Sequence, residues 1–270
     1  MCTMTWWTDA GPGRYSVFFN RDESKKRSIA EPPAVFEEAE TGTRFLVPID
    51  PDAGGTWMFA NEYGLVVTLL NWYDRELPDK NGGAFESRGL LVKNLAGNRN
   101  VSDLRKALAA IDYEKYRPFH LLAFSPEEIS KWSWPGRKTN QQGLIGEPTL
   151  LDRGTPEQPV SSSSFETEQV LQARREALLA ANPQSADDLE AFQNNFGEPS
   201  TAFTPRMNRP DAQTWSRSRV DVSPEIIHFR YVVEQPNHEG DGETLESSLP
   251  RFEHRVDATE ADSVGGDEAG

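Results

Sequence analysis

Two reactive groups can come together at the start of this chain. Its only cysteine, Cys2, directly follows the initiator Met in a sequence of 270 residues. Removal of Met1, which is usual before a small second residue, would give Cys2 both a thiol and a free α-amino group. These groups titrate near ~8.5 and ~8, so the amine can accept the thiol proton while the sulfur attacks a carbonyl carbon. The alternative is that Cys2 is a small buried apolar residue without a chemical role.

A charged cluster follows the second apolar segment. The sequence RYSVFFN (14–20) leads directly into Arg21, Asp22 and Glu23. If this segment pairs with the N-terminal segment as a β-hairpin, Arg21 would lie beside Cys2 and its guanidinium would favour the thiolate. Asp22 would then hold the ammonium group through a charge-assisted hydrogen bond. The alternative is an exposed Arg–Asp pair, which contributes little to stability.

A third candidate group ends the most apolar segment, LVVTLLN (65–71). The Asn71 amide could donate a hydrogen bond to a developing oxyanion, or it could simply cap the turn that follows. Trp72 and Tyr73 come next and are candidates for the rim of a pocket that binds an apolar ligand. Trp57, in contrast, is expected in the core.

The elements that must position these groups follow from the pattern of apolar residues. Strands are predicted at 2–8, 14–20, 43–50, 56–60, 65–71, 119–125, 213–222 and 225–233. Helices are predicted from Ser87 to Gly97, from a Ser102 cap, over 165–181, and from a Ser185 cap to Gly197, the last packing Leu189, Phe192 and Phe196 inward. Residues 135–159 are typical of a long loop. This order indicates an α+β fold in which helices cover antiparallel sheets.

The charge balance limits the classes of partner. The chain has 28 Lys and Arg against 43 Asp and Glu, a net charge of −15. Nucleic acids and anionic membranes bind basic surfaces, so neither is expected as a main partner. Residues 1–20 lack the basic start and apolar core of a signal peptide, and no segment approaches the ~18 apolar residues of a membrane span. We therefore expect a cytoplasmic protein without membrane insertion.

The chain is expected to form one domain with a tail. No segment resembles a linker before Glu234, so residues 1–233 are predicted to be a single domain. Residues 234–270 are acidic, rich in Gly and nearly free of aromatic residues, which predicts a disordered tail. The four histidines show no metal-ligand spacing and Cys2 is the lone cysteine, so no metal site and no cofactor are predicted. The oligomeric state stays open.

The combination of motifs is more specific than any one of them. In order along the chain stand MC, NRDE, GGTW, NEYGLVVTLLN and SRGLLV, and TWSRSRVDV (214–222) follows later. Together they resemble the NRDE family, also called the Transport and Golgi organisation 2 family, a branch of the N-terminal-nucleophile (Ntn) hydrolase fold. The stretch NEYGLVVTLLN is also similar to the segment of penicillin V acylases and bile salt hydrolases that ends in an oxyanion-hole Asn. The resemblance implies a four-layer αββα sandwich of two antiparallel sheets with helices outside.

The same resemblance implies roles for individual residues. Cys2 would be the nucleophile, Arg21 and Asp22 would support it, and Asn71 would donate to the oxyanion. Two features depart from the acylases: Arg and Asp are adjacent here, and VSSSSF (160–165) stands where a second Asn is expected, so that Ser162 is the candidate there.

The expected activity is therefore hydrolysis of a linear amide bond in a small acylated molecule by an N-terminal cysteine. The alternative is a non-catalytic binding or carrier protein for a small molecule, such as a lipid or haem, on the same scaffold. The two alternatives share a small-molecule partner.

Overall fold

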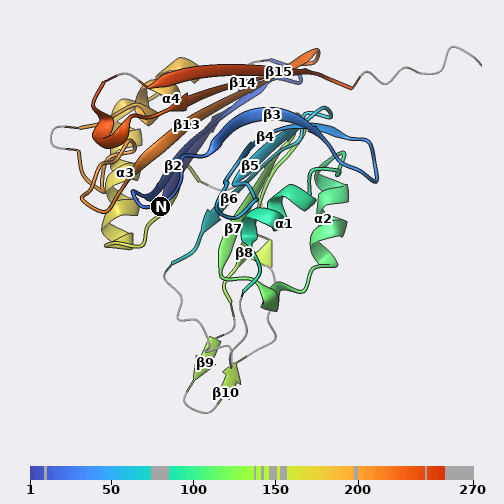
Figure 1. Cartoon of the computed structure of the whole chain (residues 1–270), viewed down its shortest axis with the longest axis horizontal. Helices are drawn as coiled ribbons and strands as arrows, with labels where there is room; N and C mark the ends of the chain where they lie inside the picture. The colour runs from blue at the N-terminus through green and yellow to red at the C-terminus, as the bar shows by residue number, and fades with distance from the viewer. Residues whose placement is uncertain are drawn as a thin grey trace, which may run out of the picture.

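Two antiparallel β-sheets lie face to face at the centre of the fold (Figure 1). The computed structural model describes residues 1–8, 11–73, 85–136, 138–140, 143–145, 151–152, 157–197, 200–240 and 242–252. In spatial order, the first sheet contains β12 (Val160–Ser162), β1 (Cys2–Trp7), β2 (Tyr15–Ser24), β13 (Ala212–Val222), β14 (Ile226–Val233) and β15 (Glu243–Pro250). The second contains β11 (Leu151–Asp152), β8 (Ile129–Trp134), β7 (Phe119–Phe124), β6 (Val66–Asn71), β5 (Met58–Asn61), β4 (Arg44–Ile49) and β3 (Glu31–Glu37). Outside both sheets, β9 (Lys138–Asn140) pairs with β10 (Gly143–Ile145).

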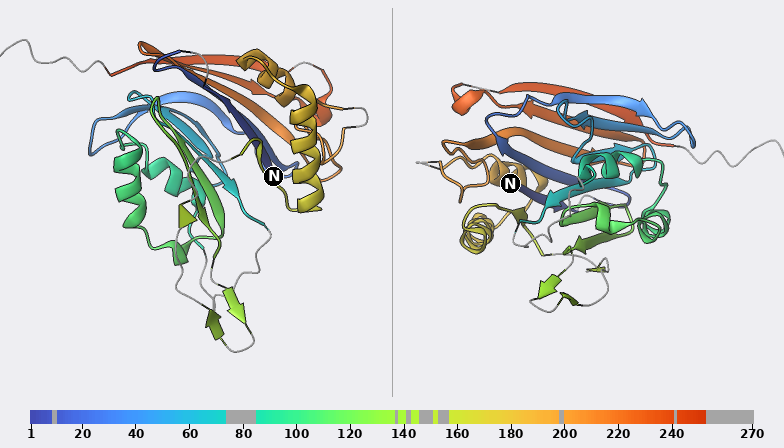
Figure 2. Two further views of the ribbon diagram at one scale, coloured as in Figure 1. Left: turned by 180° about the vertical axis from the view of Figure 1, so that it is seen from behind. Right: turned by 60° about the horizontal axis from the view of Figure 1, so that its bottom comes forward.

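Helices cover the outer face of each sheet. On the second sheet lie α1 (Arg88–Asn94) and α2 (Val101–Ala109), and on the first lie α3 (Thr167–Ala181) and α4 (Ala186–Gln193), as Figure 1 and Figure 2 show. Short 3-10 turns span Tyr113–Lys115 and Pro236–His238. The order helix, sheet, sheet, helix confirms the predicted four-layer αββα fold of the α+β class.

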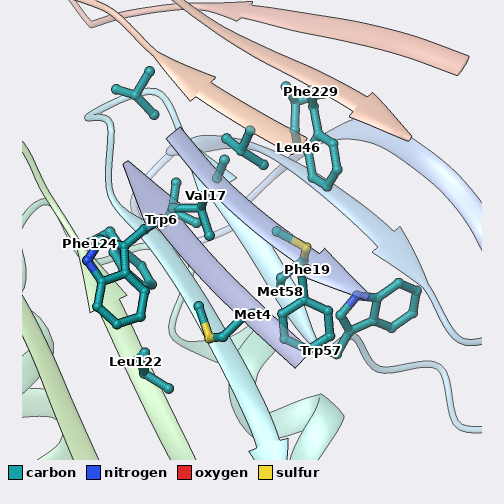
Figure 3. Packing of buried hydrophobic residues seen from close by; sticks show 14 of the residues in the cluster. Met4, Trp6, Val17, Phe19, Leu46, Trp57, Met58, Leu122, Phe124 and Phe229 are labelled. Carbon is teal, nitrogen blue, oxygen red and sulfur yellow. The ribbon is translucent and has the colours of Figure 1, made fainter. Parts of the chain in front are cut away.

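The main hydrophobic core fills the space between the sheets (Figure 3). Met4 of β1 and Phe19 of β2 are fully buried there with Met58 of β5. Successive side chains of a strand alternate between its two faces. Cys2, two residues before Met4, and Arg21, two residues after Phe19, therefore lie on this same inner face, at one end of the hairpin.

The opposite face of the β1–β2 hairpin contacts the helices. Phe18 of β2 is buried with Leu178 of α3 and Leu189 of α4. A corresponding core on the far side of the second sheet joins Val67 of β6 to Leu104 of α2. Each strand in the centre of the fold thus has apolar contacts on both faces, which explains the continuous apolar segment that ends at Asn71.

Helix caps fix the helix starts. The Ser87 hydroxyl accepts the Leu90 N–H at the start of α1, and the Ser185 hydroxyl accepts the Asp188 N–H at the start of α4, so both predicted starts are confirmed. The predicted Ser102 cap is wrong, because α2 begins earlier with Asn100 as its cap.

The predicted disorder of residues 234–270 is wrong for Glu243–Pro250. This segment forms β15, which pairs with β14 over its whole length. Leu249 is buried in the main core, while most of the other side chains of β15 are exposed. Backbone hydrogen bonds rather than buried side chains place this edge strand, and a mostly polar strand carries no apolar alternation to recognise. Residues 253–270 lie outside the described part of the chain.

Candidate active site

The β1–β2 hairpin brings the charged cluster to the N-terminus. Cys2 lies directly opposite Arg21 in the antiparallel register, as expected, and opposite Ser162 of β12 on its other side. Directly opposed residues of antiparallel strands point to the same face, with Cβ atoms ~4.5–5.5 Å apart. Ser162, Cys2 and Arg21 therefore form a row across the inner face of the first sheet.

Two cavities lie beside this row. The first, of about 240 Å³, is formed by the ends of β1 and β2, the loop after β4, the end of β6 and the segment before α1. Of the residues predicted from the sequence, it is lined by Cys2, Arg21, Asp22 and Asn71. The second, also of about 240 Å³, is lined by Asn71, Trp72, Tyr73 and Ser162. The structure thus divides the predicted residues between two neighbouring cavities that share Asn71.

Arg21 is a buried and well-held cation. Its Nη2 donates to the Asp50 carboxylate at 2.8 Å, and its guanidinium lies 4.6 Å from the centroid of the Trp57 ring. Its Nη1 is buried without a hydrogen-bond partner among the described residues. Arg21 therefore presents a fixed positive charge next to Cys2, with one nitrogen still able to donate.

Asp22 points to the opposite face of the sheet. Its carboxylate accepts hydrogen bonds from the Thr214 hydroxyl at 2.7 Å and from the Arg174 guanidinium at 3.3 Å. Thr214 stands at a bulge of β13, and such bulges redirect side chains locally. The N-terminal ammonium of Met1 donates to the Asp22 backbone carbonyl at 3.1 Å. Strand alternation thus separates the Asp22 carboxylate from the position expected for it, in which it would hold the ammonium group.

Arg174 is a residue of this region that the sequence reasoning missed. It is fully buried in α3, where it donates to the Asp22 carboxylate and to the Ala202 carbonyl at 2.9 Å. It also donates to the Thr3 hydroxyl, and its Nη1 lies 3.5 Å from the Cys2 carbonyl oxygen. One side chain therefore ties α3 to both strands of the hairpin directly behind Cys2.

A sequence signal for Arg174 does exist. It stands midway between Val170 and Leu178, at the four-residue spacing of the buried stripe of α3. A charged residue at such a position is buried only with a partner. Asn20 also contacts a helix and not Cys2. Its amide donates to the Gln193 carbonyl at 2.8 Å and so holds α4 against β2.

The groups around Asn71 form a short polar chain. The Asn71 amide donates to the Tyr73 hydroxyl at 2.9 Å, and the ring centroids of Trp72 and His120 are 4.4 Å apart. The Ser162 hydroxyl is buried and has no hydrogen-bond partner among the described residues. Asn71 and Ser162 can therefore supply donors from two different sheets.

Burial raises the pKa of the Cys2 thiol to about 11. The Met1 ammonium lowers this pKa and the Asp22 carboxylate raises it, and smaller lowering effects come from the Asp22 backbone N–H and from Arg21. Met1 is itself buried against Val170. While Met1 is present, the thiol is therefore protonated at neutral pH.

Two motifs, GGTW and SRGLLV, meet at the wall of the first cavity. The Thr56 N–H donates to the Gly89 carbonyl at 3.0 Å. A Cβ added to Gly55 would lie only 2.4 Å from the carbonyl carbon of Gly89, so this close backbone approach needs glycine. The contact fixes Arg88, which lines the cavity, relative to the loop before β5.

Neither a metal-ligand cluster nor a membrane-spanning helix occurs among the described residues. Among them, no group of three or more His, Cys, Asp or Glu is arranged to hold a metal ion. In the same part of the chain, no helix is long and apolar enough to cross a membrane. The first cavity presents thiol, guanidinium, carboxylate and amide groups.

Solved structures with a similar fold include three hydrolases. The penicillin V acylase from Agrobacterium tumefaciens has a TM-score of 0.46 and 12% identity, with 85% of this chain and 82% of that chain covered. A conjugated bile acid hydrolase from Clostridium perfringens has a TM-score of 0.48 and 14% identity, with 93% and 92% covered. An N-acylethanolamine-hydrolyzing acid amidase ortholog from Caenorhabditis elegans has a TM-score of 0.44 and 10% identity, with 81% and 92% covered. At 10–14% identity, the similarity to these structures is one of overall fold.

The sequence itself decides the family. No curated protein sequence matches the chain at a significant level. The profile of the family described as Transport and Golgi organisation 2 matches residues 1–181, which is well over half of the chain and contains the β1–β2 hairpin, Asn71 and α3. The chain therefore belongs to the Transport and Golgi organisation 2 family.

Proposed function

We propose that the protein is a cysteine amidohydrolase whose nucleophile is Cys2 after removal of Met1. The observation that carries the proposal is the placement of Cys2 at the start of a strand, opposite Arg21 and on the wall of a cavity that Asn71 also lines. A cavity of about 240 Å³ suits part of a small acylated molecule rather than a folded partner.

The reaction needs only groups that the processed chain would carry. The free α-amine of Cys2 takes the thiol proton, and the sulfur forms a bond to the carbonyl carbon of the amide. The carbonyl oxygen becomes an oxyanion; as it collapses, the carbon–nitrogen bond breaks and the leaving amine takes the proton from the α-ammonium. Water, deprotonated by the same amine, then attacks the thioester, releases the acid and restores the thiol.

Neighbouring groups would support these steps. The Arg21 cation stabilises the thiolate, as its lowering effect on the Cys2 pKa indicates. The Asn71 amide and the Ser162 hydroxyl, which has no hydrogen-bond partner in the described part of the chain, are the proposed donors to the oxyanion. The Asp22–Arg174 pair acts from behind by holding the hairpin, so both are positioning residues.

Removal of Met1 is the step that would make the site competent. The Met1 backbone carbonyl accepts the Asp22 N–H at 3.1 Å, and its side chain occupies its own apolar site. Removal exposes the Cys2 nitrogen as an amine and takes away the Met1 carbonyl, which competes with the sulfur for the Asp22 N–H. Loss of a buried methionine costs about 1.5–3 kcal/mol of stability, which is the expected consequence of processing.

The test uses intact mass with an activated ester. The Met-less chain is incubated with 4-nitrophenyl acetate, and we expect nitrophenolate release with a single acetyl adduct, mapped to Cys2 by peptide analysis. Cys2→Ser keeps the amine and the shape but has a far less acidic hydroxyl, so its acylation should fall by orders of magnitude. Acylation of the Cys2→Ser chain at the same rate and on other residues would overturn the proposal.

A binding function is the second candidate, and one observation favours it. The cavity beside Trp72 and Tyr73 has room for a small apolar ligand and does not include Cys2. A carrier would retain ligand affinity in Cys2→Ser and would lose it in Trp72→Ala. Tryptophan fluorescence during titration with a fatty acid or haem measures this binding. Saturable binding that Trp72→Ala abolishes, together with no acylation of the Met-less chain by 4-nitrophenyl acetate, would favour the carrier.

A further inference from the structure

Two arginines line the Cys2 cavity without an ion-pair partner among the described residues. Arg88 and Arg117 both line the cavity. Arg88 donates to the Pro118 backbone carbonyl at 2.7 Å, and the Arg117 guanidinium lies 5.4 Å from the centroid of the Phe85 ring. Among the described residues, neither guanidinium forms an ion pair with a carboxylate.

The acidic groups of the same cavity are already engaged. The Asp50 carboxylate binds Arg21 and Arg27, each at 2.8 Å. The Glu86 carboxylate lies 3.4 Å from Lys115. The Glu23 carboxylate accepts the Ser24 N–H at 2.8 Å and lies 4.0 Å from Arg21. Asp22 is paired with Arg174 on the other face of the sheet.

Backbone contacts fix the two segments that carry Arg88 and Arg117. The Glu86 N–H donates to the Lys115 carbonyl at 2.8 Å, which ties the segment before α1 to the segment before β7. The close contact of Gly55 with Gly89 holds the same segment from the other side. Burial lowers the pKa of Arg88, and the Arg117 charge lowers it as well, while Tyr73, Cys2 and Glu23 raise it. The effect of Arg117 is the one expected of like charges that lie close together.

A third cationic group faces the same space. Arg21 is 4% exposed and its Nη1 has no hydrogen-bond partner among the described residues. An unpaired buried donor is costly unless a ligand satisfies it. Arg21, Arg88 and Arg117 thus line the same cavity as Cys2.

We propose that Arg88 and Arg117 form a subsite for a carboxylate group of the molecule that reacts at Cys2. Forked guanidinium groups match a planar carboxylate in geometry and charge, so an anionic substrate would satisfy donors that no described residue satisfies. The inference rests on the proposed function in one respect, namely that Cys2 is the reacting group. It adds a substrate class: small acylated molecules that carry a carboxylate.

The single cysteine makes a direct test available. Iodoacetate and iodoacetamide alkylate the same sulfur, and only the first carries a carboxylate, so the ratio of their rates cancels changes in general thiol reactivity. The ratio is measured by intact mass for the folded chain and for the chain unfolded in urea. We expect a larger iodoacetate-to-iodoacetamide ratio in the folded chain.

Arginine variants then show which side chains cause the preference for iodoacetate. Arg88→Gln keeps a donor for the Pro118 carbonyl, and Arg117→Gln changes an exposed side chain. Each should lower the ratio about fivefold, the upper range for one exposed ion pair. Arg99→Gln is the matched control, since Arg99 is exposed beside the Tyr63 ring and does not line the cavity.

Two outcomes are decisive for the subsite. An unchanged ratio in both Arg88→Gln and Arg117→Gln, with thermal unfolding as in the parent chain, overturns it. A ratio that falls in these variants and not in Arg99→Gln supports it, even if the Met-less chain releases no product from 4-nitrophenyl acetate. Failure of the subsite and failure of the hydrolase proposal are therefore read from different measurements.

Discussion

Adjacent residues of β2 face opposite sides of the first sheet. The polar residues at the end of this strand therefore contact two different parts of the protein. Arg21 faces the cavity beside Cys2, whereas Asn20 and Asp22 hold α4 and α3 from the other side. Motif resemblance alone assigned Asp22 and Arg21 to the same task. The direction of each side chain follows from the pairing register, and the register could be predicted only by assuming the hairpin.

Replacement of Arg21 tests the electrostatic link to the thiol. Arg21→Ala removes a cation that lowers the Cys2 pKa, so the pKa should rise. Below the pKa, the thiolate fraction falls about tenfold for each unit by which the pKa rises, and the rate of alkylation by iodoacetamide falls with it. The rate is followed by intact mass between pH 7 and pH 9, with Arg99→Ala as the control. Equal rates for Arg21→Ala and the parent would show that the two residues are not coupled.

At the scale of elements, α4 shows what periodicity predicts and where it stops. The spacing of Leu189 and Phe192 predicted the buried face of this helix, and both residues are buried against Phe18. Phe196 was expected on the same face, but α4 ends at Gln193 and the Phe196 ring instead lies 4.9 Å from the His238 ring. A contact with a distant segment determines the position of the Phe196 side chain, so the local spacing of apolar residues could not predict that position.

The packing of α4 can be measured with a matched pair of leucines. Leu189 is 1% exposed and Leu179 of α3 is 72% exposed. Leu189→Ala should lower the free energy of unfolding by ~2–5 kcal/mol, the range for a buried leucine, while Leu179→Ala should change it by at most ~0.5 kcal/mol. Urea denaturation gives both values. Similar small losses in the two variants would mean that α4 does not pack on the sheet.

The edge strands and the burial of charged side chains were the hardest features to predict from the sequence. The central strands and the helix starts at Ser87 and Ser185 follow from apolar runs and caps. In contrast, β3 begins with consecutive prolines after Glu31, and β15 is mostly polar, so neither carries the pattern of a buried strand. Arg174 was missed for a related reason, because its role depends on groups from three separate segments.

The whole molecule is held together by polar clusters as well as by its three apolar layers. The Glu234 carboxylate, fully buried after β14, accepts hydrogen bonds from Arg206 at 2.6 Å and from Arg217, and lies 3.3 Å from His238. These groups come from different segments of the chain. Burial alone would raise the pKa of Glu234, but His238 and the two arginines lower it to about 2.

This cluster predicts a specific pH dependence of stability. Because the folded-state pKa of Glu234 is below its unfolded value of about 4.5, its contribution is complete above that pH and is lost as the pH falls towards 2. A shift of this size corresponds to roughly 3 kcal/mol at pH 7. Glu234→Gln should therefore be less stable than the parent in urea at pH 7, and this difference should shrink between pH 4.5 and pH 2. A difference independent of pH, or one equal to that of exposed Glu243→Gln, would contradict this assignment.

The central claim concerns the whole chain and its N-terminus, namely that the freed amine of Cys2 activates its own thiol. The most direct measurement compares one preparation before and after methionine aminopeptidase treatment, with intact mass and hydrolysis of 4-nitrophenyl acetate followed together. We predict that hydrolysis is low while Met1 is retained, since burial holds the Cys2 pKa at about 11, and that it rises in proportion to the Met-less fraction. Hydrolysis of equal rate in the Met1-retaining chain, or none in the fully processed chain, would contradict the account.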